Sequence, residues 1–220
     1  MKKLIITTFL ACMYSFTASA GVNVGISGQM GLFAATGNET HATATESGAA
    51  GSYKKSGSEH GAAAFSSVFL EVDVQDRFLV GIDYVPAALE TDSVESRRMD
   101  KTTTGSATNV ENKVQIDFED LTTVYVGLML TENMYVKGGM VMVDVITNET
   151  LGTGGSYGNT DLDGTMIGLG YRKAMDNGMF VGFEGNYLDF DGTSLTSGDM
   201  TVKIKSLNGV TGKVSVGRSF

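Results

Sequence analysis

The sequence predicts an all-β chain that folds as an eight-stranded antiparallel up-and-down transmembrane β-barrel. Two observations predict it: apolar and polar side chains alternate along eight segments, and the connections between them alternate strictly between short turns and long loops. No segment after residue 20 holds eighteen consecutive apolar residues, so the sequence excludes a membrane-spanning helix there. Strands are therefore the only elements that could carry this chain across a membrane.

The first twenty residues have the features of a secretory signal peptide. Lys2 and Lys3 precede an apolar run too short to span a bilayer, and Ala18 to Ala20 form a small-residue cleavage site. We expect residues 1–20 to be a cleaved signal peptide and residues 21–220 to be the barrel. A lipoprotein signal with an acylated Cys12 is the rival interpretation. Cleavage after Ala20 would remove this only cysteine and leave no intramolecular disulfide.

The charge of the chain argues against nucleic acid as a partner. The formal net charge is −9, and loss of the two N-terminal lysines makes it more negative. A protein that binds phosphate backbones usually carries a basic surface instead.

The first three segments alternate with a period of two. In the run 22–32, valine, isoleucine, methionine and leucine share one face, and small or polar residues share the other. The segments 64–74 and 78–84 repeat this pattern and are joined by a turn of three residues. Glu71 and Asp83 lie on the polar faces of these two segments.

Five further segments complete the set: about 112–130, 134–146, 162–174, 179–190 and 200–220. The fourth is expected to keep Ile116 and Phe118 on the lipid-facing side together with Val124, so that Asp117 and Glu119 face inward. In the eighth, Val202, Ile204, Val210, Val214, Val216 and Phe220 share a parity, which places Lys203, Lys205 and Lys213 inward.

The fifth segment fits either facing. If Tyr135 faces lipid, Lys137 must snorkel to the interface and Asp144 points inward. The opposite parity buries Lys137 and exposes Asp144. The first arrangement is the one we favour from the sequence.

The long connections all fall at one end of the expected barrel. They cover about residues 34–63, 87–111, 147–161 and 191–199, and they are rich in glycine, serine and threonine. Transmembrane barrels have this asymmetry, whereas a soluble sandwich has no reason to send every long loop to one end. In hydrocarbon every backbone N–H and C=O must be paired, so the sheet has to close without edges.

Aromatic residues lie near the ends of the expected strands. Tyr84 and Tyr187 stand near the outer ends, and Phe78, Tyr171 and Phe220 near the inner ends. We expect these side chains to form the two aromatic girdles at the membrane interfaces.

The signal peptide, the eight alternating strands and the terminal phenylalanine resemble the small bacterial outer-membrane β-barrel proteins, the family of the OmpA membrane domain, OmpX and the opacity-type proteins. The resemblance implies residence in the outer membrane of a Gram-negative cell, among lipid and lipopolysaccharide. It also implies that the barrel-assembly machinery reads the C-terminal strand, through Val214, Val216 and Phe220.

The inward parity gathers charges that must pair or be hydrated in a narrow lumen. We expect a lumen charge network of Glu71, Asp83, Arg172, Glu184 and Lys213. Within it, Glu184 and Lys213 should pair, and Arg172 is a possible partner for Glu71 or Glu184. An eight-stranded interior is just wide enough to be filled by side chains, which favours a plug over a conducting path.

These features predict a structural or surface-interaction role, adhesin-like, with the external loops exposed to a possible ligand at the cell surface. The alternative is a narrow passive porin-like channel for small hydrophilic solutes or ions. No catalytic role is expected, because His41 and His60 both lie in the first long loop. The runs at Asp161–Gly164 and Asp189–Gly192 lack the spacing of a calcium loop, so no metal or cofactor is predicted.

Overall fold

The computed structural model describes residue 7 and the ranges 21–41, 52–75, 77–101, 107–198 and 200–220. Within them the chain forms one antiparallel sheet of eleven strands. The strands are β1 (Gly21–His41), β2 (Tyr53–Val74), β3 (Phe78–Tyr84), β4 (Leu89–Glu90), β5 (Val94–Lys101), β6 (Ala107–Met129), β7 (Met134–Leu151), β8 (Thr160–Ala174), β9 (Met179–Phe190), β10 (Thr193–Ser197) and β11 (Met200–Ser219).

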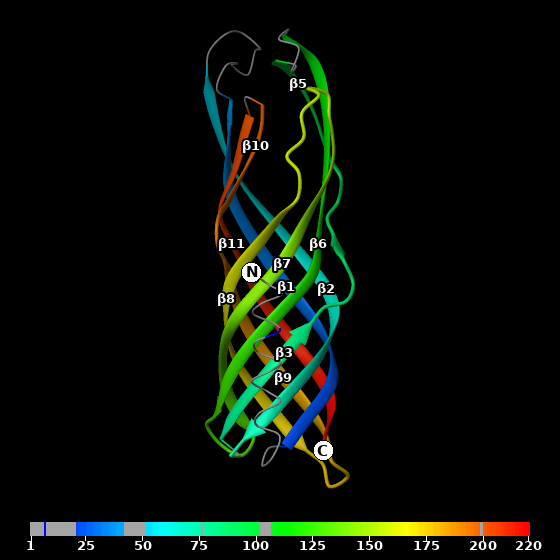
Figure 1. Ribbon diagram of the computed structural model, residues 1–220, viewed down its shortest axis with the longest axis vertical. Helices are drawn as coiled ribbons and strands as arrows, with labels where there is room; N and C mark the ends of the chain where they lie inside the picture. The colour runs from blue at the N-terminus through cyan, green and yellow to red at the C-terminus, as the bar shows by residue number, and fades with distance from the viewer. Residues whose placement is uncertain (1–6, 8–20, 42–51, 76, 102–106, 199) are drawn as a thin grey trace.

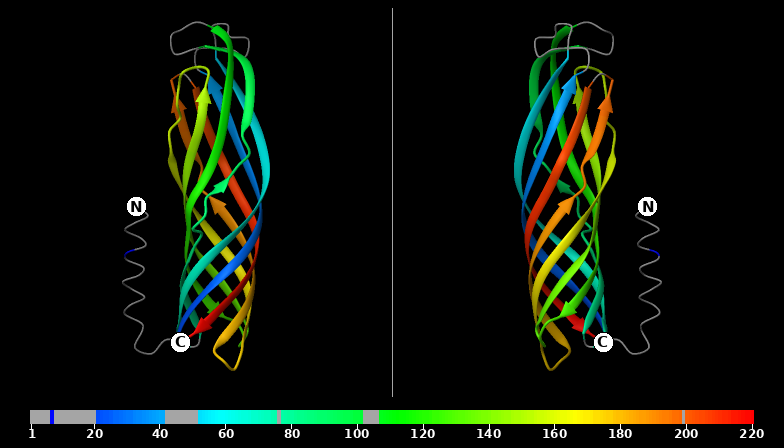
Figure 2. Two further views of the ribbon diagram at one scale, coloured as in Figure 1. Left: turned by 90° about the vertical axis from the view of Figure 1, so that its right-hand side faces the viewer. Right: turned by 90° about the vertical axis from the view of Figure 1, so that its left-hand side faces the viewer.

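Eight of these strands close into a ring in the order β1-β2-β3-β6-β7-β8-β9-β11, and β11 pairs with β1 to complete it (Figure 1). The seam is also held at its end, where Val22 and Phe220 exchange two backbone hydrogen bonds of 3.2 and 2.9 Å. The predicted eight-stranded antiparallel barrel is confirmed. The strands slope around the barrel axis, and the C-terminus lies at the end with the short turns (Figure 2).

The outer wall of the barrel is apolar. Ile26 is 65% exposed, Ile167 64% and Phe183 53%. A soluble protein rarely exposes so continuous an apolar surface, whereas lipid tails cover one at no cost. No helix in the described part of the chain is long and apolar enough to span a membrane.

The strands extend well into the regions that the sequence predicts as loops. β1 and β2 pair as far as His41 and Tyr53, so most of the expected loop 34–63 is sheet. β4 and β5 pair with the part of β6 that lies beyond its pairing with β3. In the same way, β10 pairs with the part of β11 that lies beyond its pairing with β9. The predicted loops 34–63, 87–111 and 191–199 are therefore wrong in extent, because strands with water on both faces need no alternation.

A β-bulge reverses the facing of the outer half of β6. Glu119 pairs with Asp144 and Thr122 with Met142, so β6 holds one residue more than β7 between these pairs. Asp120 has a φ of 53°, in the left-handed region that one class of β-bulge uses. Phe118 consequently pairs with the buried Val145 on the inner wall. The expectation that Ile116 and Phe118 face lipid, with Asp117 and Glu119 inward, is wrong.

A second register shift lies between β1 and β11. Thr36 pairs with Ser206, but the next residue, Gly37, pairs with Ile204. The extra residue in β11 reverses its parity, so Ile204 no longer shares a face with Val210, and Lys203 is exposed. The expectation of one parity from Val202 to Phe220 is wrong for this reason.

The facing that we favoured for the fifth segment is also wrong. On β7, Tyr135 is 1% exposed and Lys137 is 6% exposed, and both side chains lie inside the barrel. Asp144 shares the outward parity of Met134 and Val136. Inside the lumen Lys137 pairs with the carboxylate of Glu184 on β9, and this partner compensates for the burial of the lysine charge.

Candidate functional site

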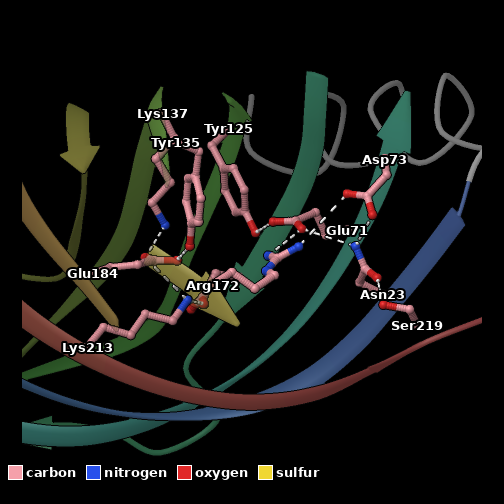
Figure 3. Close-up of polar contacts among 11 residues, drawn as sticks. Asn23, Glu71, Asp73, Tyr125, Tyr135, Lys137, Arg172, Glu184, Lys213 and Ser219 are labelled. Carbon is pink, nitrogen blue, oxygen red and sulfur yellow. Dashed lines mark hydrogen bonds and ion pairs between the residues drawn. The ribbon is translucent and has the colours of Figure 1, made fainter. Parts of the chain in front are cut away.

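Polar and charged side chains of the ring strands meet inside the barrel (Figure 3). We call them the lumen network: Asn23 on β1, Glu71 and Asp73 on β2, Asp83 on β3, Tyr125 on β6, Tyr135 and Lys137 on β7, Arg172 on β8, Glu184 on β9, and Lys213 on β11. The alternation of each strand turns one or two of these residues inward.

Glu184 binds the most side chains on its side of the lumen. The Lys137 ammonium lies 2.5 Å from one of its carboxylate oxygens, and the Tyr135 hydroxyl donates to the other at 2.6 Å. The Lys213 ammonium lies 3.8 Å from the same oxygen that Lys137 contacts. Glu184 and Lys213 are thus within ion-pair distance, although each has a closer partner.

Lys213 joins this group to β3. Its ammonium donates to Asp83 at 2.5 Å and also lies 4.9 Å from the centre of the Phe69 ring. Lys213 is 4% exposed and Asp83 6%. Because the lysine contacts two carboxylates and an aromatic face, its burial is compensated on several sides.

Glu71 is the centre of the other half of the network. Arg172 lies 2.5 Å from one carboxylate oxygen, and the Tyr125 hydroxyl donates to the other at 3.0 Å. Asn23 donates to Glu71 at 3.3 Å and to Asp73 at 2.9 Å. Of the two partners expected for Arg172, Glu71 and Glu184, the structure pairs it with Glu71, which is 1% exposed.

The lumen network includes five residues that were not in the predicted charge network: Asn23, Asp73, Tyr125, Tyr135 and Lys137. The two tyrosine rings lie against the inner wall, over glycines of the neighbouring strands. The ring of Tyr125 covers Gly81, and the ring of Tyr135 covers Gly170. A side chain on either glycine would clash with the ring. An inward aromatic opposite an inward glycine is the sequence signal that could have revealed them.

An apolar cluster lines the lumen on the side of β6 to β9, beyond the lumen network and toward the long connections. Its buried members are Tyr125, Val141, Val143, Val145, Leu162, Met166, Leu188 and Phe190, from β6, β7, β8 and β9. Ile116, Phe118, Leu121 and Leu207 pack against it. The bulge in β6 makes this possible, because it turns Ile116 and Phe118 to the inner wall.

The expected girdle residues lie on the outer surface. Phe78 is 41% exposed, Tyr171 42% and Tyr187 41%, while Tyr84 is half-buried and donates to Asp120 at 2.6 Å. Of the three residues expected to form the assembly signal, Val214 and Val216 lie on the outer face of β11, with 50% and 42% of their surface exposed, and Phe220 follows its end with 74% exposed.

The two histidines lie apart from the lumen network. His41 is buried at the end of β1, with Nε2 2.9 Å from the Glu39 carboxylate. His60 is exposed on β2, opposite Ala34. In the described ranges no three histidine, cysteine or acidic side chains are grouped so that they could hold a metal ion.

No protein-family model matches the chain, and no curated protein matches it either. Among solved structures it is similar to Ail, the attachment invasion locus protein of Yersinia pestis, with 12% identity, 89% of this chain and 99% of that chain covered, and a TM-score of 0.35. It is also similar to the outer membrane protease OmpT from Escherichia coli (12% identity, 91% and 97% covered, TM-score 0.38) and to the outer membrane protein OprG from Pseudomonas aeruginosa (14%, 89% and 96%, TM-score 0.38).

The chain has the fold of a bacterial outer-membrane β-barrel. This assignment rests on its own strand pairing, in which eight antiparallel strands close into a ring with an apolar outer wall and buried charged side chains in the lumen.

Proposed function

We propose that this protein is a closed scaffold of the outer membrane, which stabilises the membrane and holds its external strands at the cell surface for interaction with other molecules. We propose further that residues 1–20 are removed on export and that the assembly machinery recognises the end of β11. Outer-membrane lipid and lipopolysaccharide surround the apolar wall.

The observation that carries the proposal is that two groups of side chains, the lumen network and the apolar cluster, follow one another along the inside of the barrel. The lumen network links all eight ring strands through direct contacts such as Lys137–Glu184, Lys213–Asp83 and Arg172–Glu71. The apolar cluster lies beyond it, and apart from the Tyr125 hydroxyl, which donates to Glu71, its side chains offer ions no polar partner. A hydrated ion would have to break buried ion pairs and then cross a desolvating layer. A narrow channel is therefore the less favoured alternative.

Single-channel recording in a planar bilayer tests this proposal, with the refolded barrel first verified by its heat-dependent gel mobility. We expect the folded protein to show no conductance steps. Steps that are reproducible and that change in size or ion selectivity in Glu184→Gln or Lys213→Met would establish a conducting lumen and overturn the proposal. Arg97→Ala, on the exposed surface of β5, is the control that leaves any lumen path untouched.

A further inference from the structure

The strand β8 has exposed charges of opposite sign at its two ends. Asp161 stands at the end near the long connections, and Lys173 stands at the end near the short turns. On the neighbouring strands, β9 adds the exposed Asp189 at the first end, and β11 adds the exposed Arg218 at the second. An anionic group in the lipid is therefore repelled at the first end of this part of the wall and attracted at the second.

Lys173 and Arg218 lie at a similar depth on either side of β9. Each is the last residue but one of its strand, and β9 begins between them at Met179. Arg218 pairs with Met179, and Lys173 pairs with Val181. Since neighbouring strands lie about 4.8 Å apart, the two Cα atoms are roughly 12 Å apart, a span that two long side chains can close over β9.

The structure holds this corner of the barrel in place. The Ser219 N–H donates to the carbonyl of Gly178 at 2.8 Å, which ties the end of β11 to the β8–β9 turn (Figure 2). The guanidinium of Arg218 lies 5.3 Å from the centre of the Phe220 ring. A guanidinium that stacks on an aromatic face keeps the N–H groups at its edge for an oxyanion, so this contact orients Arg218 without using up its donors.

Neither of these two cations has an acidic partner among the described residues. The buried cations of the lumen network all have carboxylate partners, such as Glu184 for Lys137. In the described ranges no carboxylate lies within ion-pair distance of Lys173 or Arg218, and Asp176 in the turn beside them is exposed to solvent. Both charges on the outer wall are therefore open to an anionic group of the lipid.

A gap in the row of outward side chains lies further along the same wall. Gly185 on β9 pairs with Gly212 on β11, and a methyl group on either would have no atom within 4 Å. The next residues in this row are large and exposed: Met30 on β1 by 73% and Leu169 on β8 by 51%. The bare backbone between these two side chains leaves room for an acyl chain to make close contact with the wall.

We infer that Lys173 and Arg218 form a binding site for an anionic phospholipid of the periplasmic leaflet, with its phosphate above the start of β9 and an acyl chain at Gly185 and Gly212. The inference deepens the proposed function, because it names one lipid of the apolar wall and rests on the short turns lying on the periplasmic side. A headgroup with a net negative charge suits two cations, whereas the ammonium group of a zwitterionic headgroup meets them with like charge.

The test uses the absence of tryptophan from the chain. Phe183→Trp places a single tryptophan on the outer face of β9, and Val68→Trp places one on β2, with β1 and β11 between the two strands. Each barrel is reconstituted in phosphatidylcholine nanodiscs with a small fraction of phosphatidylglycerol whose brominated chains quench tryptophan on contact. In Phe183→Trp we expect this lipid to associate at least about tenfold more strongly than brominated phosphatidylcholine, and in Val68→Trp we expect no such preference.

Charge-removing variants in the Phe183→Trp chain locate the headgroup. Lys173→Gln and Arg218→Gln should each weaken the association of phosphatidylglycerol about fivefold, the effect of one basic residue near an anionic lipid, and together they should abolish the preference. Arg77→Gln in the β2–β3 turn removes a charge at the same end of the barrel but away from β9, so it should bind normally. Heat-dependent gel mobility verifies that each variant is folded, and Lys173→Glu decides the question alone if Arg218→Gln does not fold.

Equal quenching by the two brominated lipids in Phe183→Trp would overturn the inference. An equal preference in Val68→Trp would also overturn it, since the whole barrel would then attract the lipid, as would a preference that survives the loss of both cations. None of these results changes the conductance test, and a conducting lumen would leave the quenching as expected. The failure of this inference is therefore distinct from a failure of the proposed function.

Discussion

Glu184 shows how single residues make the lumen stable. Its carboxylate is buried between two ammonium groups and a tyrosine hydroxyl, contributed by β7 and β11. Removing one member of a buried ion pair leaves its partner charged and without compensation.

We expect Glu184→Gln to lower the free energy of unfolding by about 3–5 kcal/mol, because Lys137 and Lys213 would then repel each other with one carboxylate fewer. Urea titration in detergent micelles measures the change. Glu111→Gln, which breaks the exposed contact with Arg97 between β5 and β6, is the matched control and should cost less than about 1 kcal/mol. Equal losses in the two variants would show that the lumen network is hydrated.

A substitution at Gly81 tests how closely the ring of Tyr125 packs against the barrel wall. A methyl group at this position would overlap the tyrosine ring. We expect Gly81→Ala to destabilise the barrel by about 1–3 kcal/mol, the usual cost of overpacking. Gly212→Ala on β11 is the control, since no atom lies within 4 Å of its added methyl group. If both variants unfold at the same urea concentration, the ring of Tyr125 can move aside freely.

At the scale of the elements, the bulge in β6 decides which residues fill the lumen. Above it, Ile116 and Phe118 pack against the apolar cluster, and Glu119 is exposed. The bulge depends on one additional residue and on the left-handed conformation of Asp120. A strand that loses this residue shifts its whole outer half by one position.

Deletion of Asp120 should therefore turn Phe118 outward and Asp117 inward, and we expect a large loss of folded barrel in the heat-dependent gel assay. Asp120→Gly keeps the residue count and accepts a positive φ, so it should fold. It also loses the bond from Tyr84, and Tyr84→Phe measures that loss separately. A deletion variant that folds as well as Asp120→Gly would contradict the role of the bulge.

The sequence predicted the strands of the closed ring well because lipid on one side and the lumen on the other impose alternation. It failed where that constraint ends. Residues 54–62 of β2 are exposed on both faces, so composition indicates a loop although β1 holds them in a sheet. The sequence pattern does not reveal the bulge in β6 either. Phe118 and Val124 have the same parity in the sequence, but they face opposite sides of the barrel wall. The facing of Lys137 depended on Glu184, a partner 47 residues away.

The whole molecule depends on the seam between its first and last strands. β11 pairs with β1 from Ser219 back to Met200, so the ring closes only when the end of the chain is in place. Phe220 contributes in two ways: its backbone exchanges hydrogen bonds with Val22, and its side chain is 74% exposed on the outer wall. These contributions can be separated by substitution.

We expect deletion of Phe220 to lower the amount of folded barrel in the outer membrane while leaving export to the periplasm intact, since the segment before Gly21 is unchanged. Phe220→Ala keeps the backbone bonds but removes the aromatic ring, so it should refold in detergent as the native chain does and still assemble poorly in cells. Phe220→Tyr should restore assembly, because tyrosine also suits a membrane interface. Membrane fractionation and heat-dependent gel mobility give the folded fraction. Normal assembly of Phe220→Ala would show that the ring is not part of the assembly signal and that the seam bonds alone matter.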